Sequence, residues 1–371
     1  MKGFDIIIIG GGLAGLVNAI LLSKEGLSVL VCEKKSYPFH RVCGEYISNE
    51  VVPFLKKHDI YPDNLGVSQI DKFMLTSTNG KKAEMPLDLG GFGVSRYVLD
   101  EFLYRKAESH GVEFKLNTTI DHVDFLEGAF SVKLKDKTVY SKLVIGAHGK
   151  RSVIDKKLKR KFISKRSPYL GVKYHIKTDL PSDSIALHNF QNGYCGISKV
   201  EDEKFNLCYL SHQENLKKFG NIDDMQEAVL YQNPFLKSIF NNSDFLFEKP
   251  EVINEISFEQ KALVENHILM CGDAAGMITP LCGNGMAMAI NASKILSEAI
   301  LSEWNNGSPN RKIIEQRYVR LWNQMFRFRL WSGRKIQNLF GSNTTSNMAV
   351  ELSKISPVAK AIMKLTHGKP F

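Results

Sequence analysis

This chain of 371 residues lacks the sequence patterns that mark membrane proteins, metal-binding proteins and repeat proteins. No apolar run approaches the ~20 residues of a membrane span, so we do not expect an integral membrane protein. The six cysteines form no Cys-x-x-Cys pair, and none of the ten histidines has a metal-ligand spacing with a partner, so we expect reduced cysteines and no metal site. Internal repeats and low-complexity segments are also absent, which argues against a solenoid.

The composition fits a globular protein with a substantial core. A hydrophobic content of 43% supports such a core, and the length suffices for two domains or for one large α/β body with an inserted module. Cys32, Cys208 and Cys271 lie in apolar, strand-like segments, as small core residues in a reducing compartment do. The chain starts almost directly with a strand rather than with a signal peptide, so we expect a cytoplasmic protein.

An excess of basic residues gives a formal net charge of +10. These residues concentrate in two segments, 133–166 and 311–335. Solvated surfaces are the simplest interpretation, and an anionic membrane surface or an acidic ligand are the alternatives. No nucleic-acid-binding motif accompanies the charge, so we expect no nucleic-acid partner.

The strongest positive signal is a glycine-rich turn near the start of the chain. An apolar strand at 5–9 leads into Gly10, Gly12 and Gly15, a helix follows, and a second strand ends at Glu33. The first glycine permits the tight turn, the second lets the backbone approach a pyrophosphate, and the third lets the helix pack on the strand. The helix N-terminus offers N–H groups to phosphates, and the glutamate can accept ribose hydroxyls. The order of these parts predicts a dinucleotide site.

A second glycine-rich turn lies far along the chain. An apolar strand at 267–271 runs into Gly272 and Asp273, and Gly283-Asn284-Gly285 precedes a helix. An aspartate just past a strand end can bind the hydroxyls of a sugar chain, although a helix cap is the plain alternative. The N–H groups before the helix can stabilise negative charge on a neighbouring ring, such as the N1–C2 edge of a reduced flavin.

Between the two turns the pattern changes to successive strands. Residues 73–85 alternate as a hairpin, with Asn79-Gly80 at its turn. The pattern then predicts four strands of an antiparallel sheet, at 169–178, 184–190, 194–200 and 205–211. We expect two helices next, one of them over 223–232, and helices over most of the chain beyond Gly285.

Taken together, these motifs resemble the FAD-dependent superfamily of para-hydroxybenzoate hydroxylase and geranylgeranyl reductase over roughly residues 1–300. The matching features are the first glycine turn with Glu33, then Arg41, Ser95-Arg96, the turn at 146–149, Gly272-Asp273, Pro280, Gly283 and Gly285. The segment Arg41-Val42-Cys43-Gly44-Glu45 is more similar to the geranylgeranyl reductase branch than to the aromatic hydroxylases.

The resemblance implies an α/β fold: a Rossmann-like FAD-binding domain with an inserted antiparallel β-sheet substrate domain and C-terminal helices. The FAD-binding domain would comprise residues 1–70, 95–165 and 263–308. The substrate domain would comprise a hairpin at 71–94 and the sheet at 166–262, and a helical region would follow at 309–371.

The resemblance also assigns roles to individual residues. FAD would be held by Gly10, Gly12, Leu13, Ala14, Gly15, Glu33, Lys34, Arg41, Gly44, Arg96, Gly272, Asp273, Gly283, Asn284 and Gly285. Cys43 and Cys282 would lie near the flavin, either as thiols that protonate the substrate or as small packing residues. Glu45 is a candidate general acid, because a buried carboxylic acid can stay protonated at neutral pH.

The chain departs from the superfamily's pattern in two places, and it also lacks the mark of a third group of relatives, the flavin halogenases. His148 stands where an aspartate is usual, either as a hydrogen-bond donor or as a turn cap, and this puts the handling of NAD(P)H in question. Residues 194–198 lack the Trp and Pro of the reductase branch, so the substrate cavity should differ. Flavin halogenases carry a Trp-x-Trp pair, whereas the tryptophans here, at 304, 322 and 331, are all C-terminal and unpaired.

We expect an FAD-dependent oxidoreductase that reduces a carbon–carbon double bond in a lipid or isoprenoid-like substrate, with NAD(P)H as electron donor. The alternatives are an NAD(P)H-dependent monooxygenase that hydroxylates an aromatic or lipid-like metabolite and a non-catalytic flavin-binding protein. Residues 313–340 combine aromatics and arginines at helical spacing, either as core or as a peripheral membrane surface. No feature of the sequence specifies an oligomeric state.

Overall fold

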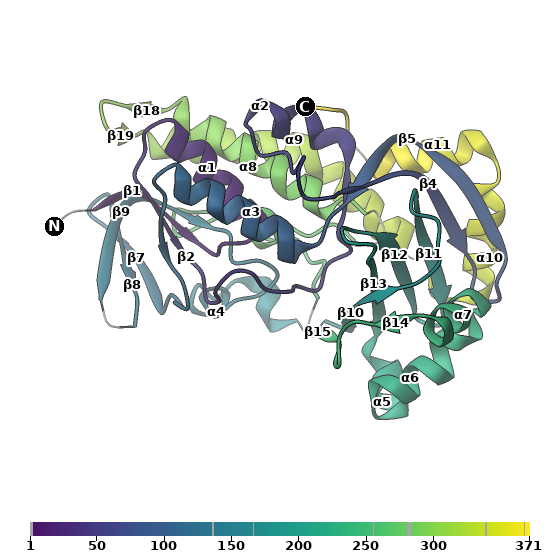
Figure 1. The fold of residues 1–371 in the computed structure, drawn as a ribbon. Helices are drawn as coiled ribbons and strands as arrows, with labels where there is room; N and C mark the ends of the chain where they lie inside the picture. The colour runs from purple at the N-terminus through teal and green to yellow at the C-terminus, as the bar shows by residue number, and fades with distance from the viewer. Residues whose placement is uncertain are drawn as a thin grey trace.

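Two large β-sheets, each with its own helices, make up the protein in the computed structural model, which describes residues 3–135, 137–165, 167–254, 256–279, 283–337, 340–366 and 368–371. Figure 1 shows the first sheet at one end of the molecule and the second at the other. Helices α1 (Leu13–Lys24), α3 (Arg96–Ser109) and α8 (Gly285–Leu301) lie with the first sheet.

The first sheet has a parallel centre. In spatial order its strands are β16 (Val264–Glu265), β17 (Ile268–Met270), β9 (Thr138–Gly146), β1 (Phe4–Ile9), β2 (Val29–Cys32) and β6 (Glu113–Lys115), with β7 (His122–Leu126) and β8 (Ala129–Lys133) added beside β9. Ile6, Ile7 and Ile8 of β1 are completely buried. Such a continuous apolar run is typical of a parallel strand that is covered on both faces.

The register of this sheet brings the sequence motifs to one edge. Ile9 pairs with Cys32 of β2 and with Gly146 of β9, so the three strands end together. Gly10 and Glu33, which follow two of these strands directly, therefore lie side by side. The carboxyl edge of a parallel sheet is where ligands bind in open α/β folds.

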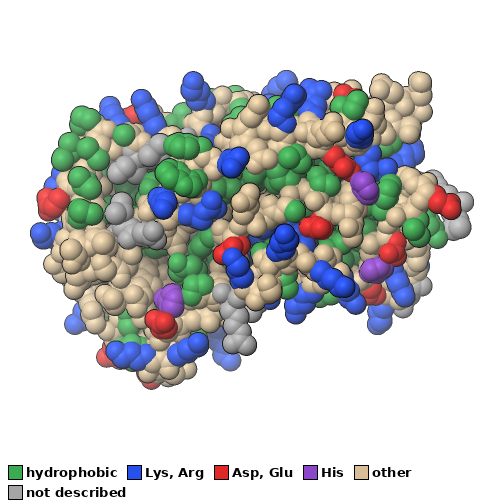
Figure 2. Space-filling model, turned by 180° about the vertical axis from the view of Figure 1, so that it is seen from behind, with side chains coloured by type: hydrophobic (Ala, Val, Ile, Leu, Met, Phe, Trp, Pro, Cys, Tyr) green, Lys and Arg blue, Asp and Glu red, His purple; other side chains and the backbone are tan. Residues whose placement is uncertain are grey.

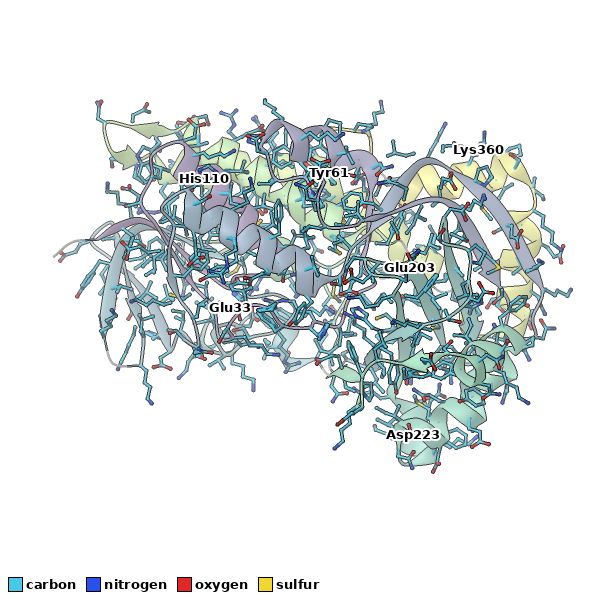
Figure 3. The ribbon with its side chains drawn as sticks, in the orientation of Figure 1. Glu33, Tyr61, His110, Glu203, Asp223 and Lys360 are labelled. Carbon is cyan, nitrogen blue, oxygen red and sulfur yellow. The ribbon has the colours of Figure 1, made fainter. Side chains whose placement is uncertain are left out.

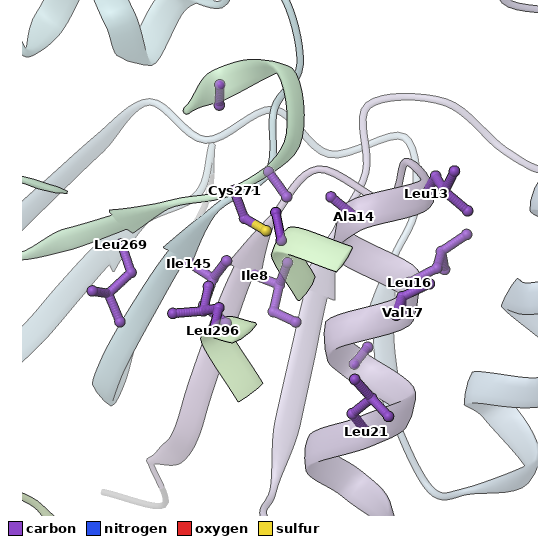
Figure 4. Close-up of a cluster of buried hydrophobic side chains, with 14 of the residues drawn as sticks. Ile8, Leu13, Ala14, Leu16, Val17, Leu21, Ile145, Leu269, Cys271 and Leu296 are labelled. Atoms are coloured by element: carbon purple, nitrogen blue, oxygen red, sulfur yellow. The ribbon is translucent and has the colours of Figure 1, made fainter. Parts of the chain in front are cut away.

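Helices α1 and α8 pack directly against each other. Asn18 of α1 donates hydrogen bonds to Ala14 O (2.7 Å) and Cys271 Sγ (3.4 Å), and Ser293 Oγ of α8 donates to Ala14 O (3.1 Å). Figure 4 shows Ala14 and Cys271 within the apolar cluster that contains Ile8, Ile145 and Leu296. The packing thus joins the two glycine-rich turns, which are far apart in the chain.

The second sheet is mainly antiparallel. In spatial order its strands are β14 (Asp244–Phe245), β10 (Tyr169–Lys177), β13 (Phe205–His212), β12 (Gly193–Lys199), β11 (Ser184–Phe190), β4 (Ser68–Thr76), β5 (Lys82–Gly93) and β3 (Tyr46–Ser48), and β15 (Glu251–Asn254) pairs with β10. Helices α5 (Gln213–Phe219), α6 (Ile222–Val229) and α7 (Pro234–Asn242) cover one face.

Alternation along the strands separates the two faces of this sheet. Val172 and Tyr174 of β10 pack in the cluster beneath α6 and α7. Lys173 and His175 therefore point the other way, toward the first sheet. We call this side the inner face.

The remaining elements are shorter or C-terminal. They are the 3-10 helices η1 (Asn49–Val51), η2 (Lys161–Ser164), η3 (Leu230–Gln232) and η4 (Gly272–Ala274), helices α2 (Val52–Lys57), α4 (Val153–Lys157), α9 (Arg311–Gln337), α10 (Asn343–Ser353) and α11 (Ser356–Thr366), and the strands β18 (Trp304–Asn305) and β19 (Ser308–Pro309). Within the described part of the chain, no helix is both long and apolar enough to cross a membrane.

The predicted α/β fold with a separate antiparallel sheet is confirmed, and the four strands predicted between 169 and 211 match β10 to β13 within two residues. One helical expectation was wrong. Three helices follow β13 instead of two, because Asn233 caps a further helix that starts at Pro234. The expectation of helices over most of the chain beyond Gly285 is confirmed by α8 to α11, between which a small hairpin turns where Asn306 and Gly307 adopt positive φ.

We expect that Tyr318→Phe lowers the free energy of unfolding by about 1 kcal/mol. The fully buried Tyr318 hydroxyl of α9 donates to Met270 O at 2.6 Å and so ties this helix to the strand before the second turn. Urea unfolding followed by circular dichroism measures the change. Tyr140→Phe, at a partly exposed position of β9, is the control, and an equal loss in both variants would contradict a role for the buried hydrogen bond.

Candidate active site

The first glycine turn forms an open anion cradle. Gly10 has φ of +102°, and a side chain there would meet Ala147 O at 2.5 Å, so only glycine fits. A side chain at Gly15 would overlap Gly10 O. Helix α1 begins after Gly12, and no side chain of the described residues caps it. The N–H groups of its first turn therefore face outward as partners for an anion.

Two arginines stand over this cradle. A Cβ on Gly12 would lie 3.6 Å from Arg96 Nη2 and 4.0 Å from Arg41 Cζ. Both guanidinium groups bind Asp100, which is almost completely buried: Arg96 donates from Nε and Nη2 at 2.7 Å each, and Arg41 from Nε at 3.1 Å. Burial alone would lower the pKa of Arg96, but the Asp100 carboxylate outweighs it and raises the pKa. Asp100 therefore holds both guanidinium groups in place over the cradle.

Glu33 closes the same cradle from the end of β2. Its carboxylate accepts hydrogen bonds from the Gly11 N–H at 2.9 Å and the Lys35 N–H at 3.1 Å, and it pairs with Arg41 at 3.3 Å. The Tyr37 hydroxyl donates to Gly11 O at 2.5 Å. In Figure 3, Glu33 lies below helix α3 on the side of the first sheet, remote from Asp223 on the outer helices of the second.

The second glycine turn packs directly on the first. Gly272 has φ of +62°, and a Cβ there would come within 2.8 Å of Ala14 Cβ. Asp273 follows in η4, with a partly exposed carboxylate that has no hydrogen-bond partner among the described residues. Lys261 donates to Asp273 O at 2.7 Å, and burial lowers the pKa of Lys261 to about 8. The aspartate is thus held by its backbone while its side chain stays available.

The start of α8 supplies a second helix N-terminus. Gly283 has φ of +60° and lies against the Tyr46 ring, where a Cβ would be 3.3 Å away. Asn284, the residue before Gly285, donates from its amide to Glu50 Oε1 at 3.3 Å. Glu50 is buried, which raises its pKa, and Arg329 of α9 lies 3.5 Å from it. Pro280, Leu281 and Cys282 lie outside the described residues, and so does the expectation that Cys282 adjoins the flavin.

Glu45 is not the protonated acid that the sequence suggested. It is completely buried with φ of +54°, and it accepts from Lys173 Nζ at 2.5 Å and lies 2.7 Å from His175 Nε2. Burial alone would raise the pKa of Glu45, but Lys173 and His175 lower it below its usual value. The prediction overlooked these two partners on β10, which favour the carboxylate form of Glu45. It also accepts from the Arg96 N–H at 2.7 Å.

The comparisons with known proteins give this geometry its context. The chain matches the FAD binding domain family over residues 3–316. It belongs to that family. The protein is thus an FAD-dependent oxidoreductase, and the predicted cofactor is confirmed.

Individual relatives fall in several branches. The chain is 28% identical over 340 residues to a digeranylgeranylglycerophospholipid reductase of Methanosarcina acetivorans. This match covers 86% of the present chain and 81% of the reductase. A geranylgeranyl bacteriochlorophyll reductase-like protein of Thermoplasma acidophilum has the same fold, with a TM-score of 0.78, 20% identity and coverage of 98% and 95%. The flavin-dependent brominase Bmp2 gives a TM-score of 0.75 at 19% identity, with coverage of 98% and 93%.

The described residues fit FAD. A helix N-terminus and two fixed arginines suit a pyrophosphate, and Glu33 beside them suits a ribose. Asp273, whose side chain has no partner among the described residues, suits the hydroxyls of the ribityl chain. Of the other residues expected at FAD, Leu13 and Ala14 are buried in the first turn of α1, whereas Lys34 and Gly44 are exposed.

His148 belongs to a buried network instead of an open turn. Its Nε2 lies 3.0 Å from Asp155 Oδ1, and Arg160 Nη1 donates to the same oxygen at 2.7 Å. Burial alone would raise the pKa of Asp155, but these two partners lower it. Arg160 also donates to Ala274 O at 3.0 Å. The network therefore holds η4 in position, a role the sequence did not reveal.

Sequence reasoning also missed Asp100 and Lys261. The spacing of four residues between Arg96 and Asp100 on a predicted helix was a usable signal for an ion pair. Nothing in the sequence links Lys261 to Asp273, because their contact depends on the path of the chain before β17.

We expect Asp100→Asn to weaken FAD binding about tenfold, or ~1.4 kcal/mol, because both arginines lose their fixed partner. Fluorescence titration of the apoprotein with FAD measures the dissociation constant. Glu101→Gln, the next residue on α3, is the matched control, since Glu101 pairs with the exposed Arg105. Equal affinities in the wild type and Asp100→Asn would contradict the role of Asp100.

Proposed function

We propose that this protein uses FAD to reduce a carbon–carbon double bond in a lipid or isoprenoid-like substrate. The observation that carries the proposal is a buried apolar cluster between the second sheet and the C-terminal helices. Its members are Leu75, Ala83, Leu187, Tyr194, Leu210, Ile256, Met277, Ala349 and Val350. None of these carries a charge, and Met277 follows Asp273 by only four residues. We propose that this apolar core continues to the substrate side of the flavin, where it suits a hydrocarbon chain.

The relatives support the same substrate class. The 28% identical archaeal protein is named a reductase of a digeranylgeranyl lipid. Bound FAD would supply the two-electron chemistry of the reduction. We assign its pyrophosphate to Arg41, Arg96 and the first turn of α1, its ribose to Glu33 and its ribityl chain to Asp273.

The chain's own residues would position the reaction and supply the proton. Cys43 lies partly exposed in the loop that precedes Glu45, and its Sγ is our candidate proton donor to the substrate carbon. The Cys43 carbonyl accepts from Asn206 Nδ2 at 3.2 Å, which fixes this loop against the inner face. Glu45 then acts as a positioning residue, because it joins Lys173 and His175 to the backbone of Arg96. We further propose NAD(P)H as the electron donor.

The proposal predicts that photoreduced protein is reoxidised by geranylgeraniol without oxygen. The flavin absorbance should return, and mass spectrometry should show a product with two added hydrogens. Phytanol, which has the same carbon skeleton without double bonds, is the control and should leave the protein reduced. If geranylgeraniol does not reoxidise the flavin, and the protein instead hydroxylates a substrate with NADPH and oxygen, the protein is a monooxygenase and the proposal is wrong.

We also propose that the protein contacts membranes through α9. The aromatic–basic patch consists of Met325, Arg327, Phe328, Trp331 and Lys335, all of them exposed. Phe328 and Trp331 are 59% and 51% exposed and stack with ring centroids 5.9 Å apart. Figure 2 shows lysines and arginines among hydrophobic side chains over the side opposite to that of Figure 1. Exposed aromatics flanked by cations suit the surface of an anionic bilayer.

Binding to phosphatidylglycerol-rich vesicles should fall about tenfold in the double variant Phe328→Ser and Trp331→Ser, as measured by co-sedimentation. Each removed ring takes away buried apolar area at the interface. Leu126→Ser, at an exposed apolar position of β7, should leave binding unchanged. Equal binding of the wild type to phosphatidylcholine vesicles, or no loss in the double variant, would contradict the proposed contact.

A further inference from the structure

A buried glutamate close to the start of α8 has no part in the reaction proposed above. Glu50 lies in η1, directly after β3, and its side chain is completely buried. Its Oε1 accepts a hydrogen bond from Asn284 Nδ2 at 3.3 Å, and its Oε2 accepts from the Gly368 N–H. Arg329 Nη1 of α9 lies 3.5 Å from Oε1. Three separate parts of the chain therefore meet at one carboxyl group.

Asn284 links this carboxyl group to the cofactor site. It directly precedes Gly285, the first residue of α8. In the part of the chain that the structure describes, its side chain does not cap this helix and donates to Glu50 instead. We expect the first N–H groups of α8 at the N1–C2 edge of the flavin, where negative charge accumulates on reduction. On this placement, one side chain separates Glu50 from that edge.

Arg329 balances the charge of Glu50. The Arg329 side chain is only 12% exposed, so water screens it little. Burial raises the pKa of Glu50, and the Arg329 cation is the main influence that opposes this rise. Two opposite charges 3.5 Å apart largely cancel beyond their own neighbourhood, whereas one of them alone in a buried site acts over a longer distance. Removal of the carboxylate would therefore expose the flavin to the field of an unpaired cation.

The segment that follows α11 covers this ion pair and holds it in place. A Cβ on Gly368 would overlap both Arg329 Nη2 and Glu50 Oε2, so only glycine lets the backbone come this close. The Phe371 N–H donates to Glu50 O at 3.1 Å, and the ring centroids of Phe371 and Phe54 lie 5.6 Å apart. Figure 1 shows this end of the chain beside α2. The carboxylate thus has a fixed geometry relative to both Arg329 and α8.

We propose that the Glu50–Arg329 pair sets the reduction potential of the bound flavin, with Glu50 as a positioning residue that acts through Asn284 and α8. The carboxylate orients the Asn284 amide and cancels the Arg329 cation. Without the carboxylate, the cation would stabilise the negative charge of the reduced flavin and raise the potential. This inference rests on the FAD site of the proposed function and is independent of the substrate.

Equilibrium reduction with xanthine oxidase beside a reference dye measures the midpoint potential of the FAD-loaded protein at pH 8. Glu50→Gln should raise this potential by about 30 mV, which is a tenfold change in the ratio of reduced to oxidised flavin for a two-electron couple. The double variant Glu50→Gln and Arg329→Gln carries neither charge and should return to the wild-type potential. Damage to the fold would add up in the double variant and could not be reversed there. Glu298→Gln, at an exposed position of α8 that pairs with Lys294, is the matched control and should leave the potential unchanged.

An unchanged potential in Glu50→Gln, or a double variant that departs from the wild type as far as Glu50→Gln does, would overturn the inference. If Glu50→Gln does not retain FAD, Arg329→Gln takes its place, and its potential should lie below that of the double variant because Glu50 then has no cation beside it. Equal potentials in these two variants would also overturn the inference. None of these measurements uses a substrate, so a failure here leaves the proposed reduction of a double bond untouched, and a failure to reduce geranylgeraniol leaves the inference standing.

Discussion

One buried carboxylate organises the cofactor site. Asp100 holds Arg96 and Arg41 over the first glycine turn, and these three charges are tolerable inside the protein only because they are paired. The pairing joins α3 to the loop after β2 that carries Arg41. The first N–H groups of α3 then bind Glu45, which follows Gly44, and Glu201, which precedes β13. The position of the second sheet therefore depends on the same helix that positions the arginines.

The inner face of the second sheet changes character from one end to the other. Glu45, Lys173 and His175 form a closed charged group at one end, and Leu187, Tyr194 and Leu210 form an apolar wall at the other. The charged group joins the sheet to the cofactor domain, because Glu45 also accepts from the Arg96 N–H. The apolar end packs in one cluster with Ala349 and Val350 of α10. Within the charged group, Lys173 and His175 lower the pKa of the buried Glu45 below its usual value, against the effect of burial.

Short-range patterns in the sequence predicted much of this structure. The glycine turns, Glu33 and the strands β10 to β13 follow from local alternation and turn chemistry, which a single sequence displays directly. The errors came from long-range contacts. Glu45 meets Lys173 and His175 only after the second sheet folds against the first, and Lys261 meets Asp273 only through the chain path before β17. The short strands β3, β14 and β15 form by pairing with longer strands, β3 with β5 and the other two with β10.

The central claim is that two distant glycine-rich turns hold the two halves of one FAD. Calorimetric titration of the folded apoprotein with FAD, with ADP and with riboflavin tests this claim most directly. We predict that one FAD binds per chain, that ADP competes with FAD, and that riboflavin binds in the presence of ADP. A folded protein that takes up no FAD, or that binds FAD without competition from ADP, would contradict the account.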